Sequence, residues 1–324
     1  MTRLALVVLW GIILASVSGG ILSADEGAAP ACEARLRFPS IYPEHRLDFE
    51  PGMNVTYVDH GQGFPVVFLH GLGADHHQWN ENMPAVQDRF RVLAIDFPGH
   101  GKSDRVHGYE YGIPKFCSAL IALFDARGID KAVLVGNSMG GQVAIYTALH
   151  HPDRVARLIL VDAAGAGDFG VKETLASAAM QLDLARVVSP GLAEMLDGFV
   201  VTRNQDGAVS TEMRAKICED AARCESRQIM MEVMGASLQS VFDNDMSRDL
   251  HRISQRTLVV WGTNDKLIPV THALRLHYRL PDSRLLLYAG VGHVPSVEVP
   301  QRFNRAMDRF LRDLADDPIR VAGR

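Results

Sequence analysis

Six short apolar runs, separated by longer stretches, constrain the fold of this chain more than any other feature. The runs are residues 66–69, 90–95, 132–135, 158–161, 258–261 and 285–288. Each is too short for a helix and is rich in Val, Ile and Leu without strict alternation, which is typical of strands buried on both faces of a parallel sheet. A seventh run, 55–58, indicates a more exposed strand near the start.

Helical patterns fill most of the intervals between the runs. They cover residues 79–89, 113–127, 139–150, 271–278 and 301–314. This alternation predicts a three-layer α/β sandwich with a mostly parallel central sheet. Residues 165–254 break the alternation, because they hold helical stretches without a convincing strand. We expect them to form an inserted helical cap over the carboxyl ends of the strands, where open α/β sheets bind ligands. The core then comprises residues 46–164 and 255–324.

The N-terminus differs in composition from the rest of the chain. Arg3 precedes an uncharged apolar stretch at residues 4–22. This pattern is typical of a secretory signal, and the stretch is also just long enough for an uncleaved membrane anchor. We expect residues 1–24 to be a signal peptide or a membrane anchor and residues 25–45 to be a linker. The protein is therefore expected to be exported, either periplasmic, secreted or anchored to the membrane.

Charge and cysteine content narrow the choice of partners. The formal net charge is −5 and no basic patch is present, so a nucleic-acid partner is not expected. In an exported protein Cys218 and Cys224 could form a disulfide, although their spacing puts them on different faces of a regular helix. Free buried thiols are the alternative for these two and for Cys32 and Cys117.

The run at 132–135 leads into Gly136-Asn137-Ser138-Met139-Gly140. These residues fit the pattern G-x-S-x-G, with a strand expected before it and a helix after it. The glycines on either side of the serine allow the strand and the helix to approach closely. Ser138 is therefore expected in a strained turn, with its hydroxyl exposed as a nucleophile. A phosphate-binding loop is a weaker alternative, because no Gly-Lys-Ser/Thr is present.

A serine hydroxyl needs a base, and the base needs an orienting acid. His293 follows the last apolar run in a loop bounded by glycine and proline, and we assign it as the base. Asp265 follows the fifth run and is the expected acid. Asp162, at the end of the fourth run, is its rival and could instead hold the loop by accepting backbone N–H bonds. We expect His272 and His277 to lie on the surface.

An acyl-transfer site also needs two donors for the oxyanion. We assign them to the backbone N–H groups of Met139, directly after the nucleophile, and of Leu72, in the glycine-rich turn after the first run. His70 is expected to support this turn. The adjacent His76 and His77 raise the question of a metal, but the sequence shows no second group of ligands to complete a site. We expect neither a metal nor a cofactor.

Five segments together resemble the α/β-hydrolase superfamily. They are "LHGLG" at 69–73, "DFPGHGKSD" at 96–104, "GNSMGGQ" at 136–142, "WGTNDKLIP" at 261–269 and "GVGHVPSVEVP" at 290–300. The resemblance implies a three-layer α/β-hydrolase sandwich with an inserted cap. It also implies that Ser138, Asp265 and His293 form the catalytic triad and that Leu72 and Met139 bind the oxyanion.

Within the superfamily the segments resemble two kinds of enzyme. "GNSMGG" resembles the elbow of hydrolases that cleave carbon–carbon bonds in aromatic ring-fission products, whereas "HGLGADHHQW" resembles bacterial lipases and monoacylglycerol lipases. We expect a serine hydrolase of small apolar carboxylic esters. The alternatives are a carbon–carbon bond hydrolase of ring-fission diketones and, third, a ligand receptor without catalysis. Acyl transfer to an acceptor other than water and the oligomeric state stay open.

Overall fold

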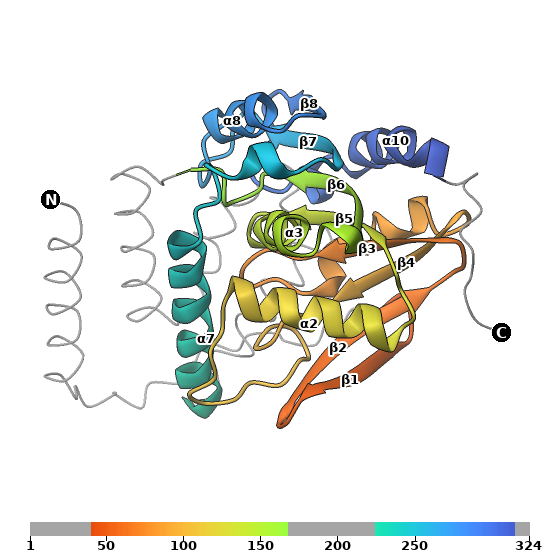
Figure 1. Cartoon of the computed structure of the whole chain (residues 1–324). Coiled ribbons are helices and arrows are strands. Elements are labelled where there is room, and N and C mark those ends of the chain that lie inside the picture. The colour runs from red at the N-terminus through yellow and green to blue at the C-terminus, as the bar shows by residue number, and fades with distance from the viewer. Residues whose placement is uncertain (1–39, 168–223, 315–324) are drawn as a thin grey trace, which may run out of the picture. The chain divides into compact units, whose positions relative to one another are not determined.

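The structure is a computed structural model that describes residues 40–167 and 224–314 (Figure 1). The chain divides into two units, Met1–Ala31 and Cys32–Arg324, and all of the described residues lie in the second. The predicted signal or anchor, most of the linker and residues 168–223 of the predicted cap lie outside the described residues. In the described ranges, none of the helices combines the length and the apolar character that a membrane crossing requires.

A single eight-stranded sheet forms the centre of the described part. Its strand order is β1-β2-β4-β3-β5-β6-β7-β8. The strands are β1 (Glu44–Glu50), β2 (Met53–His60), β3 (Phe64–Leu69), β4 (Phe90–Ile95), β5 (Ala132–Asn137), β6 (Val155–Val161), β7 (Arg256–Gly262) and β8 (Ser283–Tyr288). β2 pairs antiparallel with β1 and β4, and every other pair is parallel. The predicted parallel sheet is confirmed, and all seven predicted strands are present.

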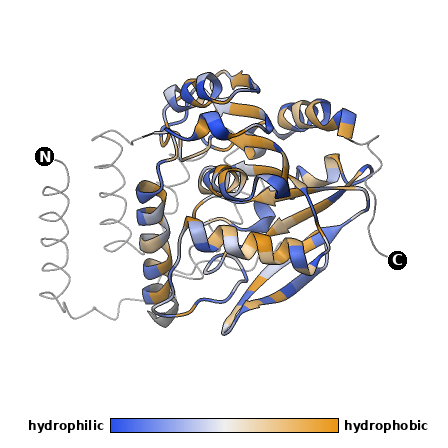
Figure 2. Cartoon of the chain, viewed as in Figure 1, coloured by the Kyte–Doolittle hydropathy of each residue, from blue (hydrophilic) through white to orange (hydrophobic). Residues whose placement is uncertain are grey.

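The apolar core divides into two layers because side chains alternate along each strand. On β3, Val67 and Leu69 face one layer, and Val66 and Phe68 face the other. The helices are α2 (Ile113–Ala126), α3 (Met139–His150), α7 (Cys224–Asp243), α8 (Thr271–Arg279), α9 (Pro295–Glu298) and α10 (Pro300–Leu311). α2, α3 and α8 contribute to the first layer and α10 to the second. The predicted three-layer sandwich is confirmed, and Figure 2 shows its central strands as mostly apolar.

α7 is the described helix of the predicted cap region, and it is helical as predicted. It is fastened to the sandwich at two places. The hydroxyl of Ser240 accepts a hydrogen bond from the backbone N–H of Ile113 at 2.9 Å. The Nε2 group of Gln142, on α3, donates to the carbonyl oxygens of Val241 at 2.9 Å and Asn244 at 2.8 Å. The C-terminal half of α7 is therefore held against the start of α2 and against α3, the helix that follows Ser138.

Four local predictions differ from the structure. Residues 55–58 were expected to form a more exposed strand, but all four are buried, because β2 lies between β1 and β4 in the sheet. The helix predicted at 79–89 is replaced by two short 3₁₀ turns, η1 (His76–Trp79) and η2 (Met83–Ala85). β1 was not predicted, and it begins within the last residues of the expected linker. His272 is buried rather than exposed, because it lies on the side of α8 that packs toward the sheet.

Candidate active site

Ser138 lies in the turn between β5 and α3 and has an unusual backbone. Its φ is 53° and its ψ is −117°, a combination that few residues other than glycine adopt. Its N–H donates to the carbonyl of Val161 at 3.0 Å, and its own carbonyl accepts from the N–H groups of Ala164 at 3.0 Å and Gln142 at 3.1 Å. These bonds hold the strained conformation, so the turn has the predicted character of a nucleophile elbow.

The glycines around Ser138 are required by close packing. A Cβ atom on Gly140 would lie 2.2 Å from the carbonyl oxygen of Leu69, and one on Gly136 would lie 2.4 Å from the carbonyl oxygen of Gly140. Both distances are far shorter than a carbon–oxygen contact allows. The start of α3 therefore lies directly against the end of β3, as the glycine spacing predicts.

Asp265 and His293 come together at the carboxyl ends of β7 and β8. The Nδ1 atom of His293 lies 2.7 Å from Oδ2 of Asp265, and the two side chains are 5% and 0% exposed. The other carboxylate oxygen of Asp265 accepts from the N–H groups of Leu267 at 2.8 Å and Ile268 at 3.0 Å. Burial raises the pKa of Asp265, but the charge and the hydrogen bond of His293 outweigh it, so the net pKa is lowered. Asp265 is therefore an ionised partner that fixes the ring of His293.

Asp162, the rival acid, lies behind this pair. Its φ is 44°, its side chain is completely buried, and its Oδ1 accepts from the N–H of Gly262 at 3.0 Å. One ligand atom each from Asp162, Asp265 and His293 lie within 4.8 Å of one another. Burial and then the charge of Asp265 raise the pKa of Asp162 well above its ordinary value. The raised pKa favours the protonated form of Asp162, whose side chain holds the end of β7 while Asp265 contacts the histidine.

A chain of side-chain hydrogen bonds joins the loops of the site. The N–H of Gly71 donates to Oε1 of Gln78 at 3.0 Å, and Nε2 of Gln78 donates to Oδ1 of Asn137 at 2.9 Å. Nδ2 of Asn137 then donates to the carbonyl oxygen of His293 at 3.1 Å and to that of Val161 at 3.0 Å. Sequence reasoning missed the roles of Gln78 and Asn137. The sequence offered one indication of a role for Asn137, which is its position directly before Ser138.

The two expected oxyanion donors belong to segments next to Ser138. Leu72 is in a tight turn closed by the N–H of Ala74, which donates to the carbonyl of Gly71 at 3.2 Å. A Cβ atom on Gly71 would lie 3.5 Å from Cβ of Ser138, so this turn rests against the serine. Met139 is the first residue of α3, where backbone N–H groups have no partner within the helix.

His70 supports the turn that contains Leu72, as predicted. Its Nε2 accepts from the N–H of Phe97 at 3.0 Å, so the proton of the neutral ring lies on Nδ1, which is 2.7 Å from the carbonyl oxygen of Gly71. The terminal methyl of Met234 packs against Gly73 in the same turn, since a Cβ atom on Gly73 would lie 3.2 Å from it. Met234 belongs to α7, so the cap region places an apolar side chain over this turn.

The gathered groups suit nucleophilic attack on a carbonyl carbon. A serine in a strained turn, a histidine held by a buried carboxylate and two sets of backbone N–H groups meet at one edge of the sheet. The structure brings all five predicted site residues to this edge.

Cys117 lies apart in the core as a free thiol, which accepts a hydrogen bond from Thr147 at 3.3 Å. The choice between a Cys218–Cys224 disulfide and free thiols, which the sequence leaves open, involves residues whose side chains lie outside the described part.

Comparison with known proteins places this arrangement in a family. A family model described as alpha/beta hydrolase fold matches residues 65–300. A 2-hydroxy-6-oxo-2,4-heptadienoate hydrolase from Pseudomonas putida is 30% identical over 82% of this chain and 95% of its own length. A solved meta-cleavage product hydrolase from Pseudomonas fluorescens is 27% identical, with a TM-score of 0.70 over 83% of this chain and 97% of its own. A solved N-acyl homoserine lactone degrading enzyme is 28% identical, with a TM-score of 0.68 over 83% of this chain and 100% of its own.

Proposed function

Because the chain belongs to the alpha/beta hydrolase fold family and is a hydrolase, we propose that it cleaves a carbon–carbon bond next to a ketone by serine catalysis. The substrate class is a 2-hydroxy-6-oxo-dienoate, the kind of compound named for the relative from Pseudomonas putida. The observation that carries the catalytic part is the 2.7 Å contact between His293 and Asp265, beside the strained turn of Ser138. The expected ester activity thereby becomes the second candidate.

In the proposed mechanism, the hydroxyl of Ser138 transfers its proton to Nε2 of His293 and attacks the ketone carbon. The N–H groups of Leu72 and Met139 stabilise the oxyanion that forms. The carbon–carbon bond then breaks, and the proton on His293 passes to the carbon that leaves as the dienol. Water, activated by His293, hydrolyses the acyl-enzyme and restores the free serine.

Asp265 has two functions in this mechanism. It accepts a hydrogen bond from Nδ1 of His293, which leaves Nε2 as the basic nitrogen, and its charge stabilises the imidazolium that forms. The two backbone N–H groups that bind Asp265 from the far side keep the carboxylate in place during both steps. The hydrogen-bond chain through Asn137 supports the same ring by holding the backbone of His293.

Hydrolysis of an apolar ester or lactone is the second candidate. It is favoured by the similarity to the lactone-degrading enzyme and by the apolar Met234 over the Leu72 turn. The same three side chains would act, but the leaving group would be an alcohol. His293 would then protonate oxygen rather than carbon.

The two candidates are separated by the specificity of the purified protein. We would compare kcat/KM for 2-hydroxy-6-oxohepta-2,4-dienoate with values for p-nitrophenyl esters of graded chain length. A higher value for the dienoate supports the first candidate, and a higher value for the esters replaces it with the second. Ser138→Ala should abolish both activities, whereas Ser118→Ala, on the exposed side of α2, should leave them unchanged. Retained activity in Ser138→Ala would refute serine catalysis.

We also propose that residues 1–24 direct export of the protein. The support is the apolar stretch at 4–22 behind Arg3. Fractionation of cells that express the full chain should recover the protein outside the cytoplasm. Replacing residues 4–22 by a polar sequence should retain it in the cytoplasm, and an unchanged distribution would contradict the proposal.

A further inference from the structure

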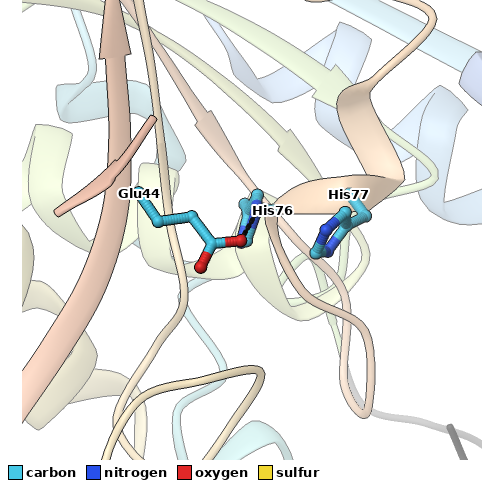
Figure 3. Close-up of side chains that lie close together, drawn as sticks. All are labelled: Glu44, His76 and His77. Carbon is cyan, nitrogen blue, oxygen red and sulfur yellow. Dashed lines mark ion pairs between the residues drawn. The ribbon is translucent and has the colours of Figure 1, made fainter. Parts of the chain in front are cut away.

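The turn after β3 carries two adjacent histidines, and the fold brings a carboxylate to them. Glu44 is the first residue of β1, and its side chain points at the ring of His76 (Figure 3). Oε1 of Glu44 lies 3.6 Å from Nε2 of His76. One ligand atom each from Glu44, His76 and His77 lie within 4.8 Å of one another. We propose that these three side chains bind a divalent transition-metal cation, with Zn²⁺ the best match, at a site separate from Ser138.

Both histidine rings are held by a further carboxylate. Nδ1 of His76 lies 2.8 Å from Oδ1 of Asp96, and Nδ1 of His77 lies 3.1 Å from Oδ1 of Asp75. A metal-binding histidine characteristically gives its second ring N–H to a carboxylate, which fixes the tautomer and the orientation of the ring. In His76 this arrangement directs Nε2 toward Glu44. That nitrogen is buried and has no hydrogen-bond partner among the described residues.

The distances suit a tetrahedral cation. Ligand atoms about 2.0–2.1 Å from zinc are about 3.4 Å apart in a tetrahedral site, close to the 3.6 Å between Glu44 and His76. The rings of His76 and His77 lie beside each other with centroids 3.9 Å apart, and one ligand atom of each lies within 4.8 Å of the other and of Glu44. Two imidazoles and one carboxylate leave a fourth position for water.

The exposure and the charge of these side chains also favour a bound cation. The His76 side chain is 0% exposed, whereas that of Glu44 is 24% exposed and provides access from solvent. Burial lowers the pKa of His76, but the negative charges of Asp96, Asp75 and Glu44 outweigh it and raise the pKa overall. The same negative potential attracts a divalent cation.

The ammonium group of Lys102 opposes a cation at this site, because it is paired with Glu44. Its Nζ lies 2.6 Å and 2.7 Å from the two carboxylate oxygens of Glu44. The Lys102 side chain is 58% exposed, so it can turn into solvent when Glu44 binds the metal. Exposed ion pairs of this kind contribute little to stability, so their loss is a small opposing effect.

The test is a zinc titration of the full chain without an affinity tag. Protein freed of metal by a chelator is titrated with Zn²⁺ against a chromophoric competitor, and Co²⁺ is added separately to detect a tetrahedral absorption spectrum. We expect one zinc ion per chain and a rise in Tm that depends on zinc concentration. Glu44→Gln should weaken zinc binding by at least about tenfold, and Asp75→Asn by about tenfold to a hundredfold.

Two control variants lie on the same strand as Glu44. His45→Ala removes an exposed histidine, and Glu50→Gln removes a carboxylate of similar exposure, so both should bind zinc as the unchanged protein does. Failure of the unchanged protein to bind zinc would overturn the proposal. Zinc binding that survives Glu44→Gln but is lost in Asp265→Asn would also overturn it, because the cation would then occupy the catalytic groups.

Discussion

Replacing Asp162 by asparagine tests whether this buried acid is protonated. Asparagine keeps the shape of a neutral carboxyl group: Oδ1 can still accept from the N–H of Gly262, and Nδ2 can donate toward Asp265. It also tolerates the left-handed backbone at this position, where φ is 44°. We therefore expect Asp162→Asn to fold normally and to retain most of the activity.

The size of the expected change in the free energy of unfolding follows from the proton that Asp162 takes up on folding. An unfolded Asp has a pKa of about 3.9, and burial followed by the charge of Asp265 raises the pKa of Asp162 in the folded protein. Between these two pKa values the folded state binds one proton more than the unfolded state. The stability of the unchanged protein therefore falls as the pH rises through this window, by up to about 1.4 kcal/mol per pH unit. The variant lacks this proton, so its relative stability rises by the same amount.

Urea unfolding of both proteins from pH 4 to pH 8 measures this difference. Taking the difference between the two proteins at each pH cancels every group that titrates equally in both. We expect Asp162→Asn to gain stability over the unchanged protein as the pH rises. Asp162→Ala is the matched comparison. It also lacks the titrating carboxyl, so it should show the same pH dependence as Asp162→Asn, but it leaves the Gly262 N–H without its acceptor and should be less stable than Asp162→Asn by about 1–3 kcal/mol at every pH. A difference between Asp162→Asn and the unchanged protein that is independent of pH would refute the protonated state.

Three further predictions concern the loops of the site. Asp265→Asn should lower kcat about 10⁴-fold with little change in fold, because the amide favours the wrong tautomer of His293. Steady-state kinetics measures the loss of kcat, and circular dichroism checks that the fold is kept. Asn137→Ala should cost about 1–3 kcal/mol, because the buried carbonyl of His293 loses its donor; an unchanged denaturant midpoint would contradict it. Gly140→Ala should destabilise by about 3 kcal/mol or more, since its Cβ would lie 2.2 Å from a backbone oxygen, and a Tm equal to that of the unchanged protein would show that the packing is looser than described.

The sequence predicts the interior of the sheet better than its edge. The runs that became β3 to β7 are buried on both faces, and such strands need continuous apolar residues. β1 is an edge strand whose residues are mostly charged or partly exposed, so its sequence carries no such signal. The pairing of β1 with β2 makes it a strand, and that pairing cannot be read from either segment alone.

In the segment at 79–89 the apolar residues were correctly identified as buried, but the predicted helix was wrong. Trp79, Met83 and Val86 are all buried, so the spacing that predicted one apolar face is real. The chain achieves the same burial with two 3₁₀ turns. Pro84 lies in the second turn, and it has no N–H with which to continue a helix through this point.

The site residues that directly follow a strand were predictable, because the order of the strands determines where they lie. Ser138, Asp265 and His293 each follow a strand, so the parallel sheet brings them to one edge. Gln78 and Glu44 were not predictable in this way. They reach their partners from a 3₁₀ turn and an edge strand, and only the folded chain shows what they touch.

The hydrogen-bond chain from Gly71 through Gln78 and Asn137 to His293 has a consequence for protein engineering. Three segments that are distant in the sequence share one set of donors and acceptors, so a loop transplanted from a relative must match the other two. A chimera that exchanges residues 71–79 alone would leave the amide of Asn137 facing a foreign side chain. Successful recombination in this fold should therefore move the three segments together.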